Sequence, residues 1–231
     1  MTEFHPRPMP PATLTRRLVR GPAGAIEVDV NDPGAPHRGI ALVAHPHPLQ
    51  GGTKDNKVVT TLARALFGLG HVALRPNFRG VGGTEGTHDE GRGETKDLLA
   101  VAAWARHEFG DLPLVLGGFS FGSFVQTRVA AHLPGARLVL AGPAVGRFPA
   151  ATVPPDTLVV HGEHDDVVPL AAVLDWARPQ HLPVVVIPGG EHFFHGRLTQ
   201  LARIVHDHFR PRARAPLRRS RCAACRSAMA A

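Results

Sequence analysis

The stretch that decides the fold reads Leu114-Val115-Leu116-Gly117-Gly118-Phe119-Ser120-Phe121-Gly122. Its first three residues form an apolar run typical of a buried strand, and residues 124–133 carry apolar side chains at helical spacing. Ser120 lies between Gly118 and Gly122, where such a strand would turn sharply into the helix. A turn of this kind holds its central residue in a strained backbone conformation and exposes the hydroxyl. Ser120 is therefore a candidate nucleophile.

Strand-like and helix-like segments alternate along the whole chain. We expect strands at residues 14–20, 25–30, 40–44, 72–75, 114–116, 137–140, 158–160 and 184–187. We expect helices at residues 56–69, 94–108, 124–133, 170–177 and 196–209. The first two strands read as a hairpin, and the later alternation implies right-handed crossovers. The sequence therefore predicts an α/β fold with an about eight-stranded, mostly parallel sheet and helices on both faces.

Chemically reactive residues follow four of these strands. His45-Pro46-His47-Pro48 follows the third strand, Ser120 the fifth, residues 161–166 (His-Gly-Glu-His-Asp-Asp) the seventh, and residues 189–192 (Gly-Gly-Glu-His) the eighth. In a parallel sheet, ligands bind outside the carboxyl ends of the strands. We therefore expect these four clusters to meet at one edge of the sheet.

The chain has 231 residues, of which 43% are hydrophobic, enough for one well-packed core. Its net charge of +7 comes from seven arginines after residue 209, because residues 1–209 hold 19 basic and 19 acidic residues. Residues 1–209 are predicted to form one domain. Residues 210–231 are predicted to be a basic, disordered tail.

The composition also limits partners and cofactors. No apolar run is long enough to span a membrane and the N-terminus has no basic leader, so we expect a cytoplasmic protein without membrane contact. Nucleic-acid binding is disfavoured because the excess charge is confined to the tail. Cys222 and Cys225 lack the context of a zinc or redox motif, and His45 and His47 lack a converging carboxylate set. We expect no metal and no cofactor, whereas the sequence leaves open whether the protein is a monomer or a homodimer.

At this point the chain resembles the α/β-hydrolase superfamily. Its order of serine, then aspartate, then histidine is typical of that superfamily. More closely, it resembles small bacterial α/β hydrolases without a cap domain, which share the strings His45-Pro46-His47-Pro48-Leu49, Gly51-Gly52-Thr53, Asp55-Asn56-Lys57 and His192-Phe193-Phe194-His195-Gly196. The resemblance covers about residues 14–209.

The resemblance implies a catalytic triad of Ser120, His192 and Asp165. His195 is the alternative base, while Asp166 and Glu163 are the alternative acids. The backbone N–H of Phe121 is the implied first oxyanion donor. The amide of His47 is the second, although many members of the superfamily have glycine where this chain has Pro46.

Other conspicuous residues have structural interpretations. The glycine-rich run at residues 79–86 matches a structural loop of the superfamily, because it lacks the lysine and hydroxyl residue of a phosphate loop. Asp55 or Asn56 is expected to cap a helix. Phe193 and Phe194 are expected to line the site or to pack in the core.

These features favour a serine hydrolase, and a carboxylesterase for small or short-acyl esters in particular. Residues 142–156, between the sixth and seventh strands, are too few for a lid domain. Thioesters or small amides are alternative substrates. Two other hypotheses remain: a non-catalytic binding protein that uses its basic tail, and a zinc or disulfide site in that tail that mediates dimer formation.

Overall fold

A hairpin opens the part of the chain, residues 13–211, that the computed structural model describes. Its strands β1 (Thr13–Gly21) and β2 (Gly24–Asp32) pair antiparallel through the tight turn between them. The other strands are β3 (Gly39–Ala44), β4 (His71–Pro76), β5 (Leu114–Phe119), β6 (Arg137–Ala141), β7 (Leu158–Gly162) and β8 (Val184–Ile187).

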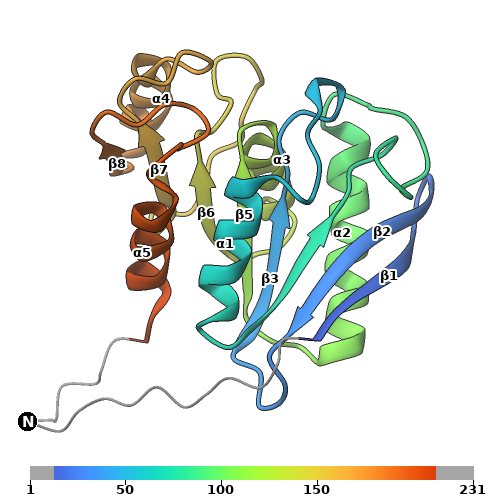
Figure 1. The fold of residues 1–231 in the computed structure, drawn as a ribbon. Helices are drawn as coiled ribbons and strands as arrows, with labels where there is room; N and C mark the ends of the chain where they lie inside the picture. The colour runs from blue at the N-terminus through green and yellow to red at the C-terminus, as the bar shows by residue number, and fades with distance from the viewer. Residues whose placement is uncertain (1–12, 212–231) are drawn as a thin grey trace, which may run out of the picture.

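These strands form one sheet in the order β1-β2-β4-β3-β5-β6-β7-β8 (Figure 1). The pair β2 and β4 is also antiparallel, whereas β4 and every strand beyond it pair in parallel. The predicted α/β-hydrolase fold with about eight mostly parallel strands is confirmed. Since all the parallel strands point the same way, their carboxyl ends share one edge, which lies at the top of Figure 1.

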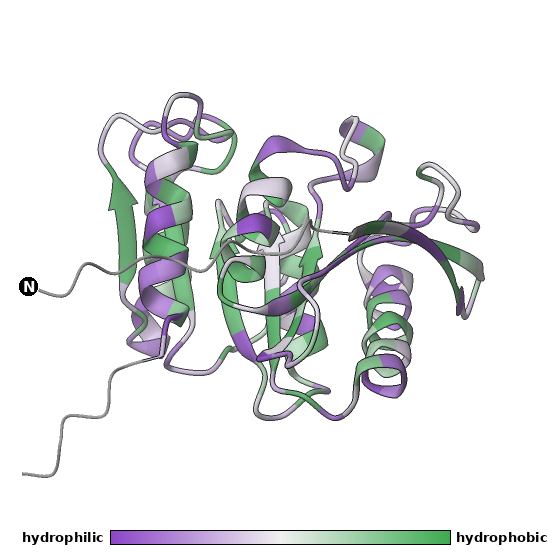
Figure 2. Cartoon of the chain, turned by 60° about the horizontal axis from the view of Figure 1, so that its bottom comes forward, coloured by the Kyte–Doolittle hydropathy of each residue, from purple (hydrophilic) through white to green (hydrophobic). Residues whose placement is uncertain are grey.

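Helices cover both faces of the sheet. The helices are α1 (Lys57–Phe67), α2 (Arg92–Phe109), α3 (Phe121–Ala130), α4 (Leu170–Ala177) and α5 (Leu198–Phe209), with short 3-10 turns η1 (Pro48–Gln50) and η2 (Arg178–Gln180). Side chains of α1 and α5 belong to one hydrophobic core, and those of α2 and α3 belong to the core on the other face. Figure 2 shows the helices with both hydrophobic and hydrophilic stripes, as expected for helices with one buried side.

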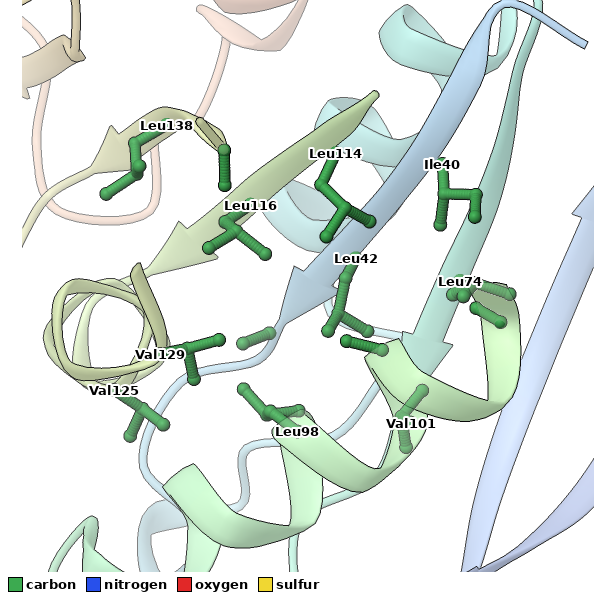
Figure 3. Close-up of a cluster of buried hydrophobic side chains, with 14 of the residues drawn as sticks. Ile40, Leu42, Leu74, Leu98, Val101, Leu114, Leu116, Val125, Val129 and Leu138 are labelled. Atoms are coloured by element: carbon green, nitrogen blue, oxygen red, sulfur yellow. The ribbon is translucent and has the colours of Figure 1, made fainter. Parts of the chain in front are cut away.

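Strand β3 shows why its sequence is apolar throughout. Ile40 and Leu42 pack in the core beneath α2 and α3, and Figure 3 shows both in the same cluster as Leu98 of α2. Ala41 and Val43 point to the opposite face and join the core beneath α1 and α5. Side chains alternate between the two faces of a strand, so a strand covered on both sides needs an unbroken apolar run.

Two of the motifs with structural interpretations serve the fold. The Asn56 side chain caps α1 by accepting hydrogen bonds from the amides of Val58, at 2.9 Å, and Val59, at 3.4 Å. The glycine-rich loop after β4 wraps around Glu27, whose carboxylate accepts a 2.6 Å hydrogen bond from the amide of Gly83. This loop therefore has a structural role, because it packs against β2 inside the fold.

The outer edge of the sheet is the long strand β1, which within residues 13–211 pairs with a neighbouring strand on one side only. Leu14 and Leu18 are 56% and 68% exposed there. Arg16, Arg17 and Arg20 are also exposed on the same strand. At the opposite edge, β8 has only four residues.

Within the described residues, the segment between β6 and β7 holds no inserted domain, so the predicted absence of a lid is confirmed. The last helix, α5, ends at Phe209, and the domain boundary between residues 209 and 210 stays a prediction. The expected tail, with Cys222 and Cys225, lies almost entirely outside the described residues. No helix within residues 13–211 is long and apolar enough to cross a membrane.

Candidate active site

Ser120 occupies the turn between β5 and α3, with backbone angles φ 54° and ψ −117°. A non-glycine residue with positive φ is strained, so the surrounding structure must hold its backbone in that conformation. A Cβ added to Gly118 would lie 2.5 Å from the amide nitrogen of Ser123, and one added to Gly122 would collide with the backbone after β3. Both flanking glycines are therefore required by the close approach of other backbone.

Backbone hydrogen bonds hold this strained turn on both sides. The amide of Ser120 donates to the carbonyl of Ala141, at the end of β6, over 3.0 Å. Its carbonyl accepts from the amides of Ser123, at 3.0 Å, and Ala144, at 3.3 Å. The turn is thus fixed to its own helix and to the neighbouring strand, so the hydroxyl is positioned before any substrate arrives.

The side chains of Ser120, His192 and Asp165 form a continuous hydrogen-bonded chain. Ser120 Oγ lies 3.0 Å from His192 Nε2, and His192 Nδ1 lies 2.7 Å from Asp165 Oδ2. All three residues are buried, with exposures of 8%, 2% and 6%. Because a carboxylate only accepts hydrogen bonds, Nδ1 carries the ring proton and Nε2 is left as the acceptor facing the serine.

The surroundings of Asp165 stabilise its ionised form. Its Oδ1 accepts hydrogen bonds from the amides of Val167, at 3.0 Å, and Val168, at 2.7 Å. Burial alone would raise the pKa of Asp165, but the hydrogen bond from His192 and that from Val168 lower it below its usual value. The negative charge beside the imidazole is therefore retained throughout the neutral pH range.

The alternative residues lie elsewhere. His195 Nδ1 lies 2.8 Å from Glu191, and 71% of its side chain is exposed. Asp166 is exposed to solvent. Glu163 accepts a 2.8 Å hydrogen bond from the amide of Gly189, and so fastens the loop after β7 to the loop that carries His192.

The loops that carry Asp165 and His192 are tied together by their backbones as well. The amide of His164 donates to the carbonyl of Gly190 over 2.8 Å. A Cβ on Gly162, the last residue of β7, would lie 2.6 Å from that same carbonyl oxygen. The approach of these two loops needs glycine at position 162, and it places the carboxylate within reach of the imidazole.

A second histidine, His161, touches the same carboxylate and was not singled out by the sequence. It is fully buried, and its Nε2 lies 2.9 Å from the carbonyl of Val168 and 3.4 Å from Asp165 Oδ2. Burial lowers the pKa of His161, so the ring is neutral and donates from Nε2. In the sequence, the one sign of this contact was the position of His161 at the end of β7. A residue at the end of a buried strand usually packs in the core, so the sequence alone did not indicate a contact with Asp165.

The two expected oxyanion donors lie beside the serine. Phe121 is the first residue of α3, where backbone amides have no partner within the helix. The amide of His47 donates no hydrogen bond to another residue between 13 and 211. The rings of these two residues pack together with centroids 4.9 Å apart. Both amides are thus available to a ligand.

Buried polar contacts fix the loop that carries His47. His45 Nδ1 donates to the carbonyl of Pro46 over 2.7 Å, while its Nε2 accepts from the amide of Phe78 over 2.8 Å. Further along the loop, Lys54 is only 3% exposed and pairs with Asp29, at 2.8 Å, and Asp55, at 3.2 Å. Although burial would lower the pKa of Lys54, hydrogen bonds to these carboxylates raise it.

A small pocket opens in front of Ser120, with a volume of about 180 Å³. His47, His192 and Phe193 line it, together with the loop at residues 50–52. Phe193 is 41% exposed, whereas Phe194 is fully buried in the core on the α1 and α5 side. Of the two phenylalanines expected at the site, only Phe193 lines the pocket.

The described residues contain no group of three or more histidine, cysteine, aspartate or glutamate side chains arranged to hold a metal ion. His45, the first histidine of the motif after β3, is fully buried. Both of its ring nitrogens are engaged in the hydrogen bonds described above.

Comparison with known proteins places this chain in a family. No protein-family model matches the chain. An α/β serine hydrolase homologue from Coxiella burnetii is 40% identical, with a TM-score of 0.78 over 84% of this chain and 97% of its own. An α/β serine hydrolase without a lid from Xanthomonas campestris is 37% identical, with a TM-score of 0.81 over 90% of this chain and 100% of its own.

Two curated proteins are also similar to this chain. An uncharacterized protein of Rickettsia prowazekii is 30% identical over 213 residues, which are 81% of this chain and 85% of that protein. The lysophosphatidylserine lipase ABHD12 of Danio rerio is 32% identical over 62% of this chain, which corresponds to only 32% of that longer protein. Given these likenesses over nearly the full length and the topology of its sheet, the chain belongs to the α/β-hydrolase superfamily.

Proposed function

We propose that this protein is a serine hydrolase that cleaves small carboxylic esters through a covalent acyl-enzyme. The observation that carries the proposal is the unbroken hydrogen-bonded chain from Ser120 through His192 to Asp165. A serine hydroxyl is a weak nucleophile unless a neighbouring base takes its proton during the attack. In this hydrogen-bonded chain, His192 is the base and Asp165 is the buried carboxylate that orients it.

The proposed reaction has two halves. Ser120 Oγ attacks the ester carbonyl carbon while its proton passes to His192 Nε2, and Asp165 stabilises the resulting imidazolium. The tetrahedral intermediate places its negative oxygen at the amides of Phe121 and His47. The bond to the leaving oxygen then breaks, and the imidazolium protonates that oxygen. Water repeats the sequence on the acyl-enzyme, which releases the acid and restores the serine.

The pocket supports small or short acyl groups as the substrates. Its volume of about 180 Å³ leaves room for a few carbon atoms, and the Phe193 ring provides an apolar wall. Thioesters and small amides would pass through the same kind of intermediate and are alternative substrates.

The first prediction concerns the three hydrogen-bonded residues Ser120, His192 and Asp165. Ser120→Ala, His192→Ala and Asp165→Asn should each lower kcat/KM for p-nitrophenyl acetate by about 10⁴-fold, because the three groups act as one unit. Matched controls are Ser123→Ala, His195→Ala and Asp166→Asn, which change the same residue types at positions outside the proposed triad. These controls should retain turnover within about threefold.

A fluorophosphonate probe tests the nucleophile independently of substrate choice. Ser120 Oγ should displace fluoride and form a bond to phosphorus, and peptide mapping should find the adduct on Ser120. The Ser120→Ala variant should not be labelled. Labelling at another residue, or full turnover in His192→Ala with loss in His195→Ala, would contradict the assignment. A folded protein that neither labels nor turns over any ester would instead favour the non-catalytic alternative.

A further inference from the structure

A second pocket adjoins the one in front of Ser120. It is larger, at about 580 Å³, and His47 lines both pockets. Its walls come from the carboxyl-end edge of the sheet: the loop before α2, the helix α3 and the loop after β6. A substrate held at the serine can therefore extend past His47 into this second space.

The floor of the second pocket is aromatic. The rings of Phe124 and Phe148 stack with centroids 5.0 Å apart and planes 18° from parallel. Phe148 also meets the ring of Phe121, at 5.1 Å. A floor of this kind receives the apolar body of a ligand.

Three arginines surround this floor, and two of them have no acidic partner within residues 13–211. Arg92 pairs with Asp89, at 2.8 Å, and with Glu90, at 3.5 Å. Among the described residues, Glu90 is the one acidic residue that lines the pocket. Arg128 lies over the ring of Phe124, 5.9 Å from its centroid. Neither Arg128 nor Arg147 forms an ion pair with any residue between 13 and 211. The pocket thus presents two guanidinium groups whose charge is not neutralised.

Several other arginines within residues 13–211 pair with carboxylates. Arg75 and Arg79, for example, pair with carboxylates inside the fold, and Arg178 pairs with Asp175 on the surface at 2.7 Å. A guanidinium with free N–H groups beside an apolar floor is the arrangement that recognises a carboxylate or a phosphate at the end of an apolar ligand. The same two arginines would repel a cationic substrate and contribute little to a neutral one.

We propose that the second pocket binds an anionic group, a carboxylate or a phosphate, on the ester that Ser120 cleaves. This inference rests on the proposed hydrolase function and specifies its substrate class. The aromatic floor holds the carbon chain between the reacting carbonyl and the anion, while Arg128 and Arg147 bind the anion itself.

The experiment compares substrates that differ only at the far end. One series consists of p-nitrophenyl esters with a six-carbon acyl chain ending in a carboxylate or a neutral carboxamide, with a five-carbon chain ending in a phosphonate as the third. A second series places the charge on the leaving group, as 4-acetoxybenzoate against 4-acetoxybenzamide. In at least one series kcat/KM for the anionic ester should exceed that for the carboxamide by about tenfold or more, the equivalent of about 1.4 kcal/mol.

Substitutions then locate the effect. The double variant Arg128→Gln/Arg147→Gln should remove most of the preference for the anion while leaving kcat/KM for the carboxamide within about twofold. The single variant Arg147→Gln changes an exposed residue and should remove part of the preference without affecting folding. Arg203→Gln is the matched control, because this arginine is 85% exposed on α5 and does not line the pocket.

The outcomes separate this inference from the proposed function. Equal turnover of anionic and neutral esters in both series would overturn the inference and leave the hydrolase intact. A preference that survives in the double variant would also overturn it. Absence of turnover for every ester, with no fluorophosphonate labelling, would overturn both. The ratio of the carboxylate to the phosphonate rate identifies which anion fits the two arginines better.

Discussion

His45 shows how one buried side chain can link two loops of the site. Its two hydrogen bonds fix a single neutral tautomer, with the proton on Nδ1 and the lone pair of Nε2 facing the amide of Phe78. Protonation of Nε2 would break the bond to that amide and leave a charge in the interior. Burial accordingly lowers the pKa of His45 to about 4.

The pKa of His45 leads to a prediction about acid stability. The pKa rises to its ordinary 6.5 on unfolding, so between about pH 6.5 and about pH 4 the unfolded chain binds the extra proton and stability falls as pH falls. Between about pH 7 and about pH 4.5, His45 should account for about 2 to 3 kcal/mol of lost unfolding free energy. Urea unfolding at each pH measures this loss.

His45→Gln keeps an acceptor near Phe78 but does not titrate, so it should show a shallower decline of stability with acid than the wild type. The control is His107→Gln, which changes an exposed histidine and should keep the wild-type slope. An unchanged slope in His45→Gln would mean that other groups, such as the buried His161, dominate the acid response.

At the residue scale, the sequence predicted what local motifs encode. The small residues around Ser120 and the glycines before His192 are visible in the sequence because the backbone itself needs them. The placement of His161 against Asp165, and of Phe194 in the core, depends on packing between loops that are distant in the chain. The two unpaired arginines of the second pocket were missed for the same reason, since their neighbours come from three separate elements.

At the element scale, strand positions were predicted correctly, but the ends around the serine were not. The strand β5 continues through Gly117 and Gly118 to Phe119, and α3 begins at Phe121, three residues before the predicted start. Glycine has low strand propensity, so the sequence signal stops at Leu116. The ladders to β3 and β6 hold both glycines in the strand, and the missing side chain of Gly118 admits the backbone of Gly122 and Ser123 at the start of α3.

The backbone amide of His47, in the loop between β3 and α1, can be tested as an oxyanion donor. His47 has a φ of −55°, which proline can adopt. His47→Pro removes the N–H, whereas His47→Ala keeps it and removes only the ring. The proline variant should therefore be about 10² to 10³-fold slower in kcat than the alanine variant.

Thermal unfolding of both His47 variants serves as the check on folding. Similar kcat values in two folded variants would exclude the amide of His47 as a donor. The comparison matters because this chain has proline at position 46, where many relatives in the superfamily have glycine.

On the scale of the whole molecule, the short connection between β6 and β7 leaves the site uncovered. No domain closes over Ser120 within the described residues, so activity should need no lipid surface. The values of kcat/KM for p-nitrophenyl esters should stop rising beyond about eight acyl carbons. They should also show no jump where the substrate begins to aggregate. Phe193→Ala, which shortens the apolar wall of the pocket, should move the limit to longer chains.

A steady rise to long acyl chains in the wild type would contradict an uncovered, small site. The cytoplasmic location and the disorder of the basic tail at residues 210–231 stay predictions from the sequence.

The unpaired rim of β1 has a consequence for how copies of this protein meet in solution. A bare strand with exposed leucines is a template for hydrogen bonding to another bare strand. Here Arg17 and Arg20 accompany Leu14 and Leu18, and neither arginine forms an ion pair within residues 13–211. Two such rims repel each other at low ionic strength, and about 1 M salt shortens that repulsion to about 3 Å. About 1 M salt is thus the condition under which pairing of two copies through this rim would first be expected.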